Sequence, residues 1–263
     1  MPSINIDRDK CQRDGICVAD CPFSLIVQDD DGYPQMRAAA DRLCISCGHC
    51  VAVCPHEALS LKEMSPADCA PVRKSLVIDV ESAEQFLKSR RSIRTYRTEQ
   101  VPHERLEKLL DTARWAPSAK NLQPVHWLVI EDPQMVQKLA ALTVDWLRET
   151  NNYPGIVDAW DEGRDMVLRG APHLAIAHAD TNSLKPEVDC TIALTYLELA
   201  AHAMGLGTCW AGIFMGAAKA YQPLIAALAL PEMHTVFGAM MLGFPKFRYF
   251  RIPARDDAKV EWR

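Results

Sequence analysis

The pattern of apolar and polar positions along the chain changes near residue 80. After Val80, apolar residues recur at helical spacing, and the segments with this pattern are 82–92, 102–116, 135–149 and 187–205. Ser82 is the expected N-cap of the first of these helices, and Gly205 suits the end of the last. Short apolar runs predict a buried strand at 126–130 and further strands at 173–179 and 235–244. Strands that alternate with helices favour an α/β sheet in this part of the chain.

The helix expected at 187–205 carries polar residues on one stripe. Thr191, Thr195, Glu198 and His202 are spaced by four, three and four residues, which places them on the same face. The rest of the circumference is apolar, so this helix belongs in a core or a subunit interface. A plain core helix with a polar seam and a catalytic role for Glu198 or His202 both fit this pattern.

Residues 1–62 show little helical periodicity and are rich in cysteine. The chain has 10 cysteines, and seven of them lie in the first 54 residues. Segment 63–80 contains two prolines and mixed charges, which predicts a linker. The expected organisation is therefore a cysteine-rich domain at 1–62, a linker at 63–80 and a second domain at 81–263.

Charge and hydropathy argue against several classes of partner. The 263 residues include 29 basic and 34 acidic side chains, and the net charge of −5 gives no electrostatic case for nucleic acid. No apolar run approaches the roughly 18 residues of a membrane helix, and the first residues lack the apolar core of a signal peptide. We expect a cytoplasmic protein without a membrane partner. In a reducing compartment, clustered cysteines indicate metal rather than disulfides.

The cysteines form two runs of one pattern, CQRDGICVADCP from Cys11 to Pro22 and CISCGHCVAVCP from Cys44 to Pro55. Thiolates two residues apart can converge on one cluster, and the cysteine before proline typically ligates the other cluster of a two-cluster ferredoxin. Paired cysteines also build zinc ribbons, but zinc has no need of this run twice. Residues 1–62 resemble the bacterial-type two-cluster ferredoxins over their whole length.

This spacing assigns the sulfurs in a crossed manner. One cluster takes Cys21, Cys44, Cys47 and Cys50 and is expected to be [4Fe–4S]. The other takes Cys11, Cys17 and Cys54, with Asp14 at the remaining corner. A carboxylate is a harder ligand than a thiolate, so this second cluster is expected to be [3Fe–4S] or an Asp-ligated [4Fe–4S].

Asp14 also has two other interpretations. Asp-Gly is common in turns of any protein, although the other run has Cys47-Gly48 and so accounts for the glycine without an aspartate. Alternatively, Cys69 replaces Asp14 as a ligand, but Cys69 lies in the linker, outside the repeat.

The second domain lacks a nicotinamide fingerprint, a P-loop and the common hydrolase motifs. Instead, SRRSIRTY gathers arginines around a serine, and guanidinium groups offer paired donors to phosphate oxygens. The residues of this clamp are Arg90, Arg91, Ser92 and Arg94. Further on, APSAKNLQP at 116–124 supplies short polar donors that could hold the polar edge of a ring. By composition alone the two segments are a basic patch and a loop, which are usually just solvated.

Taken in order with GLGTCWAG at 205–212 and LGFPKFRYFRIPAR at 242–255, these segments look like the FMN-dependent nitroreductase family over residues 81–263. The resemblance implies an α+β sandwich that forms an intertwined homodimer with FMN at two sites across the interface. It also implies that the arginine clamp binds the FMN phosphate and ribityl chain. Other implied contacts are Pro117, Ser118, Ala119, Asn121 and Gln123 along the ring, commonly from the partner subunit, Trp210, Ala211 and Gly212 on its other side, and either Arg251 or Arg255 at the phosphate.

The two resemblances together predict an oxidoreductase. Electrons would pass from the clusters to FMN and on to a small nitroaromatic, quinone-like or otherwise conjugated acceptor. An external donor, such as reduced ferredoxin, flavodoxin or an NAD(P)H-linked reductase, would supply them. No side chain is assigned as catalytic, because the chemistry falls to FMN. The alternatives are a non-catalytic relay or redox sensor for a partner protein, and a specialised relative such as a reductive dehalogenase.

Segment 151–170 is expected to cover the flavin and shape the substrate pocket. Tyr153, Trp160 and Arg164 are its candidates for stacking on a substrate or pairing with its charge. A surface helix with ordinary interface aromatics fits each of them as well.

Overall fold

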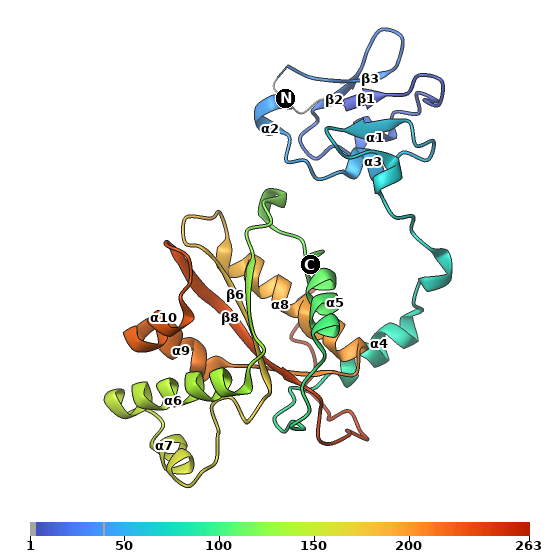
Figure 1. Cartoon of the computed structure of the whole chain (residues 1–263). Helices are drawn as coiled ribbons and strands as arrows, with labels where there is room; N and C mark the ends of the chain where they lie inside the picture. The colour runs from blue at the N-terminus through green and yellow to red at the C-terminus, as the bar shows by residue number, and fades with distance from the viewer. Residues whose placement is uncertain (1–3, 39) are drawn as a thin grey trace. The chain divides into compact units, whose positions relative to one another are not determined.

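The computed structural model describes residues 4–38 and 40–263. The chain divides into two compact units. The first ends at Val77 and also includes Lys120–Leu122, and the second comprises Ile78–Ala119 and Gln123–Arg263. Figure 1 shows the elements of each unit along the chain.

The first unit consists of two small antiparallel strand pairs and three short helices. Strand β1 (Ile4–Ile6) pairs with β4 (Leu59–Leu61), and β2 (Ile26–Gln28) pairs with β3 (Pro34–Met36). The helices are α1 (Ile16–Ala19), α2 (Ala40–Leu43) and α3 (His49–Ala52). Their buried core contains Cys17, Ile26, Cys50, Val51, Leu59 and Leu61, so two of the cysteines are also core residues.

The two cysteine runs adopt the same local conformation. Helices α1 and α3 each follow a glycine in the left-handed region, Gly15 and Gly48, both with φ of 74°. An L-residue with a β-carbon adopts this conformation only at a cost, so the two glycines allow the sharp turn before each helix. The sequence repeat is therefore also a structural repeat.

Two 3-10 turns, Pro66–Asp68 and Lys74–Leu76, lie between β4 and the first helix of the second unit. That helix, α4 (Val80–Ser89), is capped by Asp79, whose side chain accepts from the backbone N–H of Ser82. The N-cap expected at Ser82 is therefore wrong by three residues, because aspartate caps the helix equally well from an earlier position.

The second unit contains a four-stranded sheet in the order β5-β6-β8-β7, within the described residues. Its strands are β5 (His126–Ile130), β6 (His173–Asp180), β7 (Gly207–Trp210) and β8 (His234–Gly243), and every neighbouring pair is antiparallel. The alternation of strands and helices had favoured an α/β sheet, whereas antiparallel pairing makes the fold α+β. Strand β5 has the bounds expected from the sequence, but it is an edge strand and only partly buried, so the burial predicted for it was wrong.

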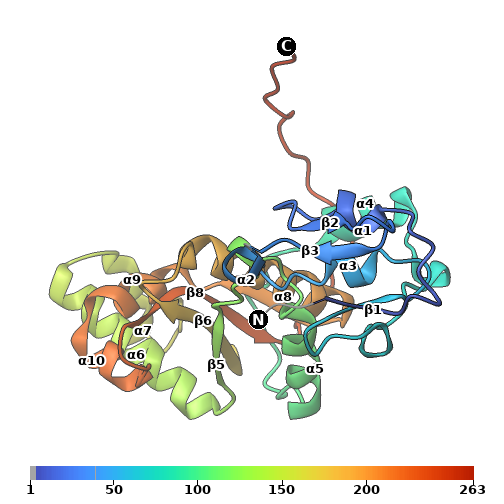
Figure 2. The same ribbon diagram turned by 90° about the horizontal axis from the view of Figure 1, so that it is seen from above.

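Helices cover both faces of this sheet, as Figures 1 and 2 show. On one face, Leu174, Ile176 and Met241 pack with residues of α6 (Pro133–Thr150), α9 (Gly212–Ala220) and α10 (Gln222–Leu228). On the other, the alternate residues Ala175, Ala177 and Met240 pack with residues of α5 (His103–Ala113) and α8 (Pro186–Ala203). Because successive strand residues point to opposite faces, one sheet supports two cores.

Helix α7 (Pro154–Asp161) follows α6 within segment 151–170. The sequence pattern had indicated helices at the positions of α4, α5, α6 and α8. It had not indicated strand β7 or helices α9 and α10. No helix of the described residues has the length and apolar character needed to cross a membrane.

Candidate functional sites

The first cysteine site consists of Cys11, Asp14, Cys17 and Cys54, whose side chains line one cavity of the first unit. Three of these residues come from the first cysteine run, and Cys54 is the last cysteine of the other. His56 lines the same cavity.

The second cysteine site consists of Cys21, Cys44, Cys47 and Cys50, which line another cavity of the same unit. Here Cys21 comes from the first run and the other three cysteines from the second. In both cavities the structure therefore brings together the cysteines that the spacing had assigned to one site.

Cys21 and Cys54 are the crossing cysteines, because each lies in the site formed mainly by the other run. A backbone N–H group donates to each of them in an equivalent way. Leu25 N donates to Cys21 Sγ at 3.3 Å, and Ala58 N donates to Cys54 Sγ at 3.4 Å. The two repeats therefore orient the sulfur of their last cysteine through the same backbone contact.

One buried thiol in each site ionises less readily than a free thiol. Burial and the neighbouring Cys47 raise the pKa of the Cys50 thiol to about 11. Burial, Cys54 and Asp14 raise the pKa of Cys17. Such thiols become thiolates together only when a cation compensates their charge, and iron in a cluster supplies that charge. No three His, Cys, Asp or Glu side chains of the described residues are placed to hold a single metal ion.

Each carboxylate oxygen of Asp14 faces a polar group. Its Oδ1 accepts from Ile16 N at 3.1 Å, and its Oδ2 lies 3.6 Å from Nε2 of His56. His56 was not among the residues singled out from the sequence. Comparison of the two runs could have found it, because His56 stands where the other repeat has Phe23.

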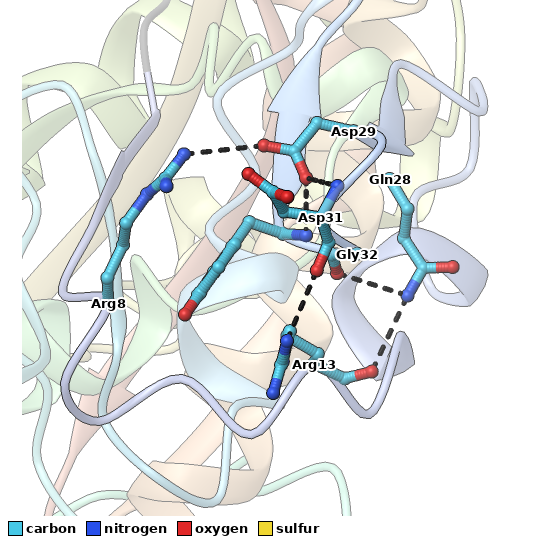
Figure 3. A network of polar contacts seen from close by, with 7 residues as sticks. Arg8, Arg13, Gln28, Asp29, Asp31 and Gly32 are labelled. Carbon is cyan, nitrogen blue, oxygen red and sulfur yellow. Dashed lines mark hydrogen bonds and ion pairs between the residues drawn. The ribbon is translucent and has the colours of Figure 1, made fainter.

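A polar network fixes the loop that carries Cys11 and Asp14, as Figure 3 shows. Arg8 pairs with Asp29 at 3.4 Å, and Arg13 donates to the carbonyl of Asp31 at 3.3 Å. Gln28 donates from Nε2 to the carbonyls of Arg13 and Gly32. The loop is thereby tied to the turn between β2 and β3.

Cys69, the alternative ligand, packs against the same small core and donates weakly to the carbonyl of Ser65. It is not among the residues that line either cysteine cavity.

In the second unit, the predicted arginine clamp lies at the end of α4. Arg90, Arg91 and Arg255 line one cavity, together with Ile252 and Pro253. Arg91 Nε is buried and has no hydrogen-bond partner among the described residues. An anionic group is the natural partner for such an orphaned guanidinium atom.

The clamp segment is fastened to the sheet and to α8. Ile93 N donates to the carbonyl of Thr208 at 2.8 Å. Arg90 Nη1 donates to Glu198 Oε1 at 3.0 Å, and Ser89 Oγ lies 3.1 Å from His202 Nε2. Glu198 and His202, which belong to the polar stripe of α8, thus contact the clamp segment directly. Burial and the nearby Arg90 charge lower the pKa of His202.

The loop at 116–124 forms a separate group. Pro117, Ser118 and Gln123 line a cavity with Asp189 of α8, and this cavity shares no residue with the arginine cavity. Ala119 N donates to Asp189 Oδ1 at 2.9 Å, and Asp189 is 2% exposed. Asp189 fixes the loop, and the local sequence gave no sign of this role because the two segments lie 70 residues apart.

The remaining predicted contacts are distributed as follows. Asn121 belongs to the first unit, where its Nδ2 donates to the carbonyls of Ile45 and Ser46 at 3.3 and 3.2 Å. Trp210 ends β7, Ala211 is buried, and Gly212 begins α9. Of the two C-terminal candidates, Arg255 lines the arginine cavity, and Arg251 is not among its lining residues.

The residues expected to shape a substrate pocket lie around α7. Tyr153 precedes this helix and is 63% exposed. Trp160 lines a groove with Thr98 and Pro133, and Arg164 pairs with Glu162. These contacts are those of an ordinary surface helix.

The comparisons with known proteins agree with this architecture. Residues 87–244 match the nitroreductase family, and residues 9–59 match the 4Fe-4S dicluster domain. A protein of Archaeoglobus fulgidus that bears the name NADH dehydrogenase/NAD(P)H nitroreductase is 30% identical over 172 residues, which are 64% of this chain and 87% of that protein.

Two further proteins are similar to this chain over part of its length. The iodotyrosine deiodinase of Thermotoga neapolitana is 29% identical over 129 residues, which are 46% of this chain and 68% of the relative. The crystal structure of a nitroreductase with bound FMN from Bacteroides fragilis superposes with a TM-score of 0.59 at 21% identity, over 68% of this chain and 96% of that one.

The fold and the paired cysteine sites define a two-part redox protein, with a ferredoxin-type module ahead of an α+β sandwich. The chain belongs to the nitroreductase family, and its N-terminal part is a 4Fe-4S dicluster ferredoxin domain. The resemblances inferred from the cysteine runs and from the arginine segment are both confirmed, as is the α+β fold class.

Proposed function

We propose that the protein is an oxidoreductase in which electrons enter at iron–sulfur clusters held by the two cysteine sites and leave through FMN to a small conjugated acceptor. The observation that carries the proposal is the crossed grouping of cysteines in two cavities of a chain whose second unit is a nitroreductase domain. A module of this kind transfers single electrons and performs no organic chemistry.

The donor sets fit the clusters. The second cysteine site supplies four thiols, as a [4Fe–4S] cluster requires. The first supplies three thiols and the Asp14 carboxylate, which fits [3Fe–4S] or an Asp-ligated [4Fe–4S] cluster. The backbone donors to Cys21 and Cys54 hold these two sulfurs in the orientation in which they cross to the other run.

The residues of the second unit fit FMN. Arg90, Arg91 and Arg255 converge on one cavity, where they would bind the phosphate, and Arg91 offers a buried donor without a partner among the described residues. Pro117, Ser118 and Ala119 would lie along the ring, supported by Asp189. When bound, FMN supplies the conversion between one-electron and two-electron transfer.

We propose further that the protein works as a homodimer, in which the loop of one protomer and the clamp of its partner meet at one flavin. Within one chain these two groups line different cavities. The C-terminal segment also exposes large aromatic side chains, including Phe250 at 80% and Trp262 at 90%, which a partner chain would cover.

A nitroaromatic or quinone-like acceptor fits the family best, and an external donor such as reduced ferredoxin, flavodoxin or an NAD(P)H-linked reductase would reload the clusters. Reductive dehalogenation is the second candidate, and the deiodinase relative supports it.

Anaerobic purification tests the proposal. We expect iron and acid-labile sulfide in the amounts of two clusters, one FMN per chain, and reduction of several nitroaromatic acceptors by the dithionite-reduced protein. Zinc in place of iron, or absence of FMN, would refute it. Absence of turnover with any small acceptor, combined with tight binding to a redox partner, would instead indicate a relay.

A further inference from the structure

Two of the differences between the cysteine sites concern side chains that lie together in each cavity. Where the second site has Cys47, the first has Asp14, and where the second has Phe23, the first has His56. Phe23 and His56 occupy equivalent positions of the repeat, because each lies two residues after the last cysteine of its run, Cys21 or Cys54.

These two positions lie together in each cavity. Phe23 lines the cavity of the second site with Cys47. His56 lines the cavity of the first site with Asp14, and the imidazole Nε2 faces Asp14 Oδ2 at 3.6 Å. The one place where a thiol is replaced by a carboxylate is therefore also the place where an apolar ring is replaced by one that can donate a hydrogen bond.

We propose that His56 is a positioning residue for the cluster at the first cysteine site. Its imidazole holds the Asp14 carboxylate in the orientation in which one carboxylate oxygen binds the fourth iron. The inference rests on the proposed function, since it requires a cluster at this site.

The physical reason lies in the weakness of a carboxylate as an iron ligand in a thiolate cluster. A carboxylate that binds through one oxygen can rotate away unless its other lone pairs are engaged. Ile16 N already engages Oδ1, and His56 faces Oδ2. Loss of a group that hydrogen-bonds a metal ligand typically changes metal affinity by about 10–100-fold.

Hydrogen bonds connect the loop around Asp14 to a neighbouring turn. Arg13 and Gln28 tie it to the β2–β3 turn, as Figure 3 shows. His56 lies two residues after Cys54, whose sulfur accepts from Ala58 N. Asp14 and His56 therefore approach each other from two segments that are each held in place.

The test is a titration of the fourth iron in the full-length protein. The purified protein is oxidised to the three-iron cluster, reduced anaerobically with dithionite and titrated with Fe²⁺. Loss of the three-iron EPR signal after reoxidation measures uptake. We expect His56→Phe, which installs the residue type of the other repeat, to weaken uptake about 10-fold or more, and His56→Gln, which retains an N–H donor, to recover most of the affinity.

Two controls separate positioning from a structural effect. The second cysteine site of the same molecule should keep its cluster in every variant. In the Asp14→Cys background, which should form a stable all-thiolate cluster, His56→Phe should have no effect on iron content.

Three results would overturn the proposal: unchanged iron affinity in His56→Phe, an equal loss in the Asp14→Cys background, or a strong nitrogen coupling to the reduced cluster that vanishes in His56→Phe. The last would make His56 itself the ligand. Failure of the proposed function looks different: the purified wild-type protein would then lack iron and sulfide, or would contain both clusters but no FMN, and the second result would leave the iron titration unaffected.

Discussion

Arg90 and Glu198 form an ion pair of 3.0 Å between the predicted phosphate clamp and the polar stripe of α8. Their side chains are 21% and 12% exposed, and Glu198 Oε1 also accepts from Thr208 at 3.4 Å. A pair this shielded is screened less than a surface pair, so it can hold the clamp in place before any ligand binds.

Glu198→Gln should therefore destabilise the second unit. The change keeps the shape of the side chain but leaves the Arg90 guanidinium without its counter-charge, which we expect to cost about 1–3 kcal/mol. Urea unfolding followed by tryptophan fluorescence measures this unit alone, because all 6 tryptophans lie after residue 114. The control is Glu84→Gln, which removes an exposed pair with Lys88 and should leave the urea midpoint nearly unchanged, because solvent screens an exposed pair. Equal stability of both variants would mean that the Arg90 pair contributes nothing.

Gly207→Ala should disturb the clamp through packing. A β-carbon at Gly207 would lie 2.5 Å from Cγ1 of the buried Ile93, in the segment that pairs with Thr208. Relief of this overlap must push the clamp away from β7, so we expect a loss of about 1–3 kcal/mol and weaker FMN binding, measured by unfolding and by flavin fluorescence.

The matched control for this packing change is Gly155→Ala in α7, where a new β-carbon meets nothing within 4 Å. Alanine is the better helix former by about 1 kcal/mol, so this variant should be unchanged or slightly stabilised. If Gly207→Ala behaves in the same way, Ile93 does not fix the clamp.

The features that depend on local sequence were the ones that could be predicted. The cysteine spacing gave the crossed grouping, and the apolar periodicity gave α5, α6 and α8. The direction of strand pairing depends on contacts between distant segments, such as Leu174 with Met241, and alternation of elements does not determine it. Strand β7 was missed because it is short and starts at Gly207, a residue that is poor in strands. Asp189 and His56 contact residues far along the chain, Ala119 and Asp14, and local sequence does not indicate such contacts. Only the internal repeat marks position 56 as different from its counterpart.

His178 should make the second unit less stable in acid. It is 5% exposed, and its Nδ1 lies 2.9 Å from Nδ1 of His234. Burial, with His234 and His126 nearby, lowers its pKa from 6.5 to about 4. Between these values the unfolded chain binds a proton that the folded chain does not, so stability falls as the pH drops from 6.5 to 4 and is unaffected above 6.5.

The melting temperature across this range, compared between wild type and His178→Gln, measures the effect. The decline should be shallower in His178→Gln. The control is His103→Gln. Glu131 raises the pKa of the exposed His103, so protonation of His103 favours the folded state, and its removal should make the decline in acid steeper. An unchanged slope in His178→Gln would show that His178 takes up its proton without unfolding.

Arg255 and Arg251 provide the sharpest test of the FMN phosphate site. Both belong to the C-terminal segment and both were sequence candidates, but Arg255 lines the cavity with Arg90 and Arg91, and Arg251 is not among its lining residues. Hydrogen bonds to a charged group contribute about 1.5–3 kcal/mol, so Arg255→Ala should weaken FMN binding about 10-fold or more. Arg251→Ala removes the same charge and should change FMN affinity less than about threefold, since only the long-range attraction is lost. Flavin fluorescence titration of the apoprotein gives both constants. An equal loss in the two variants would indicate a diffuse basic surface, and a larger loss in Arg251→Ala would move the phosphate to a different place on the second unit.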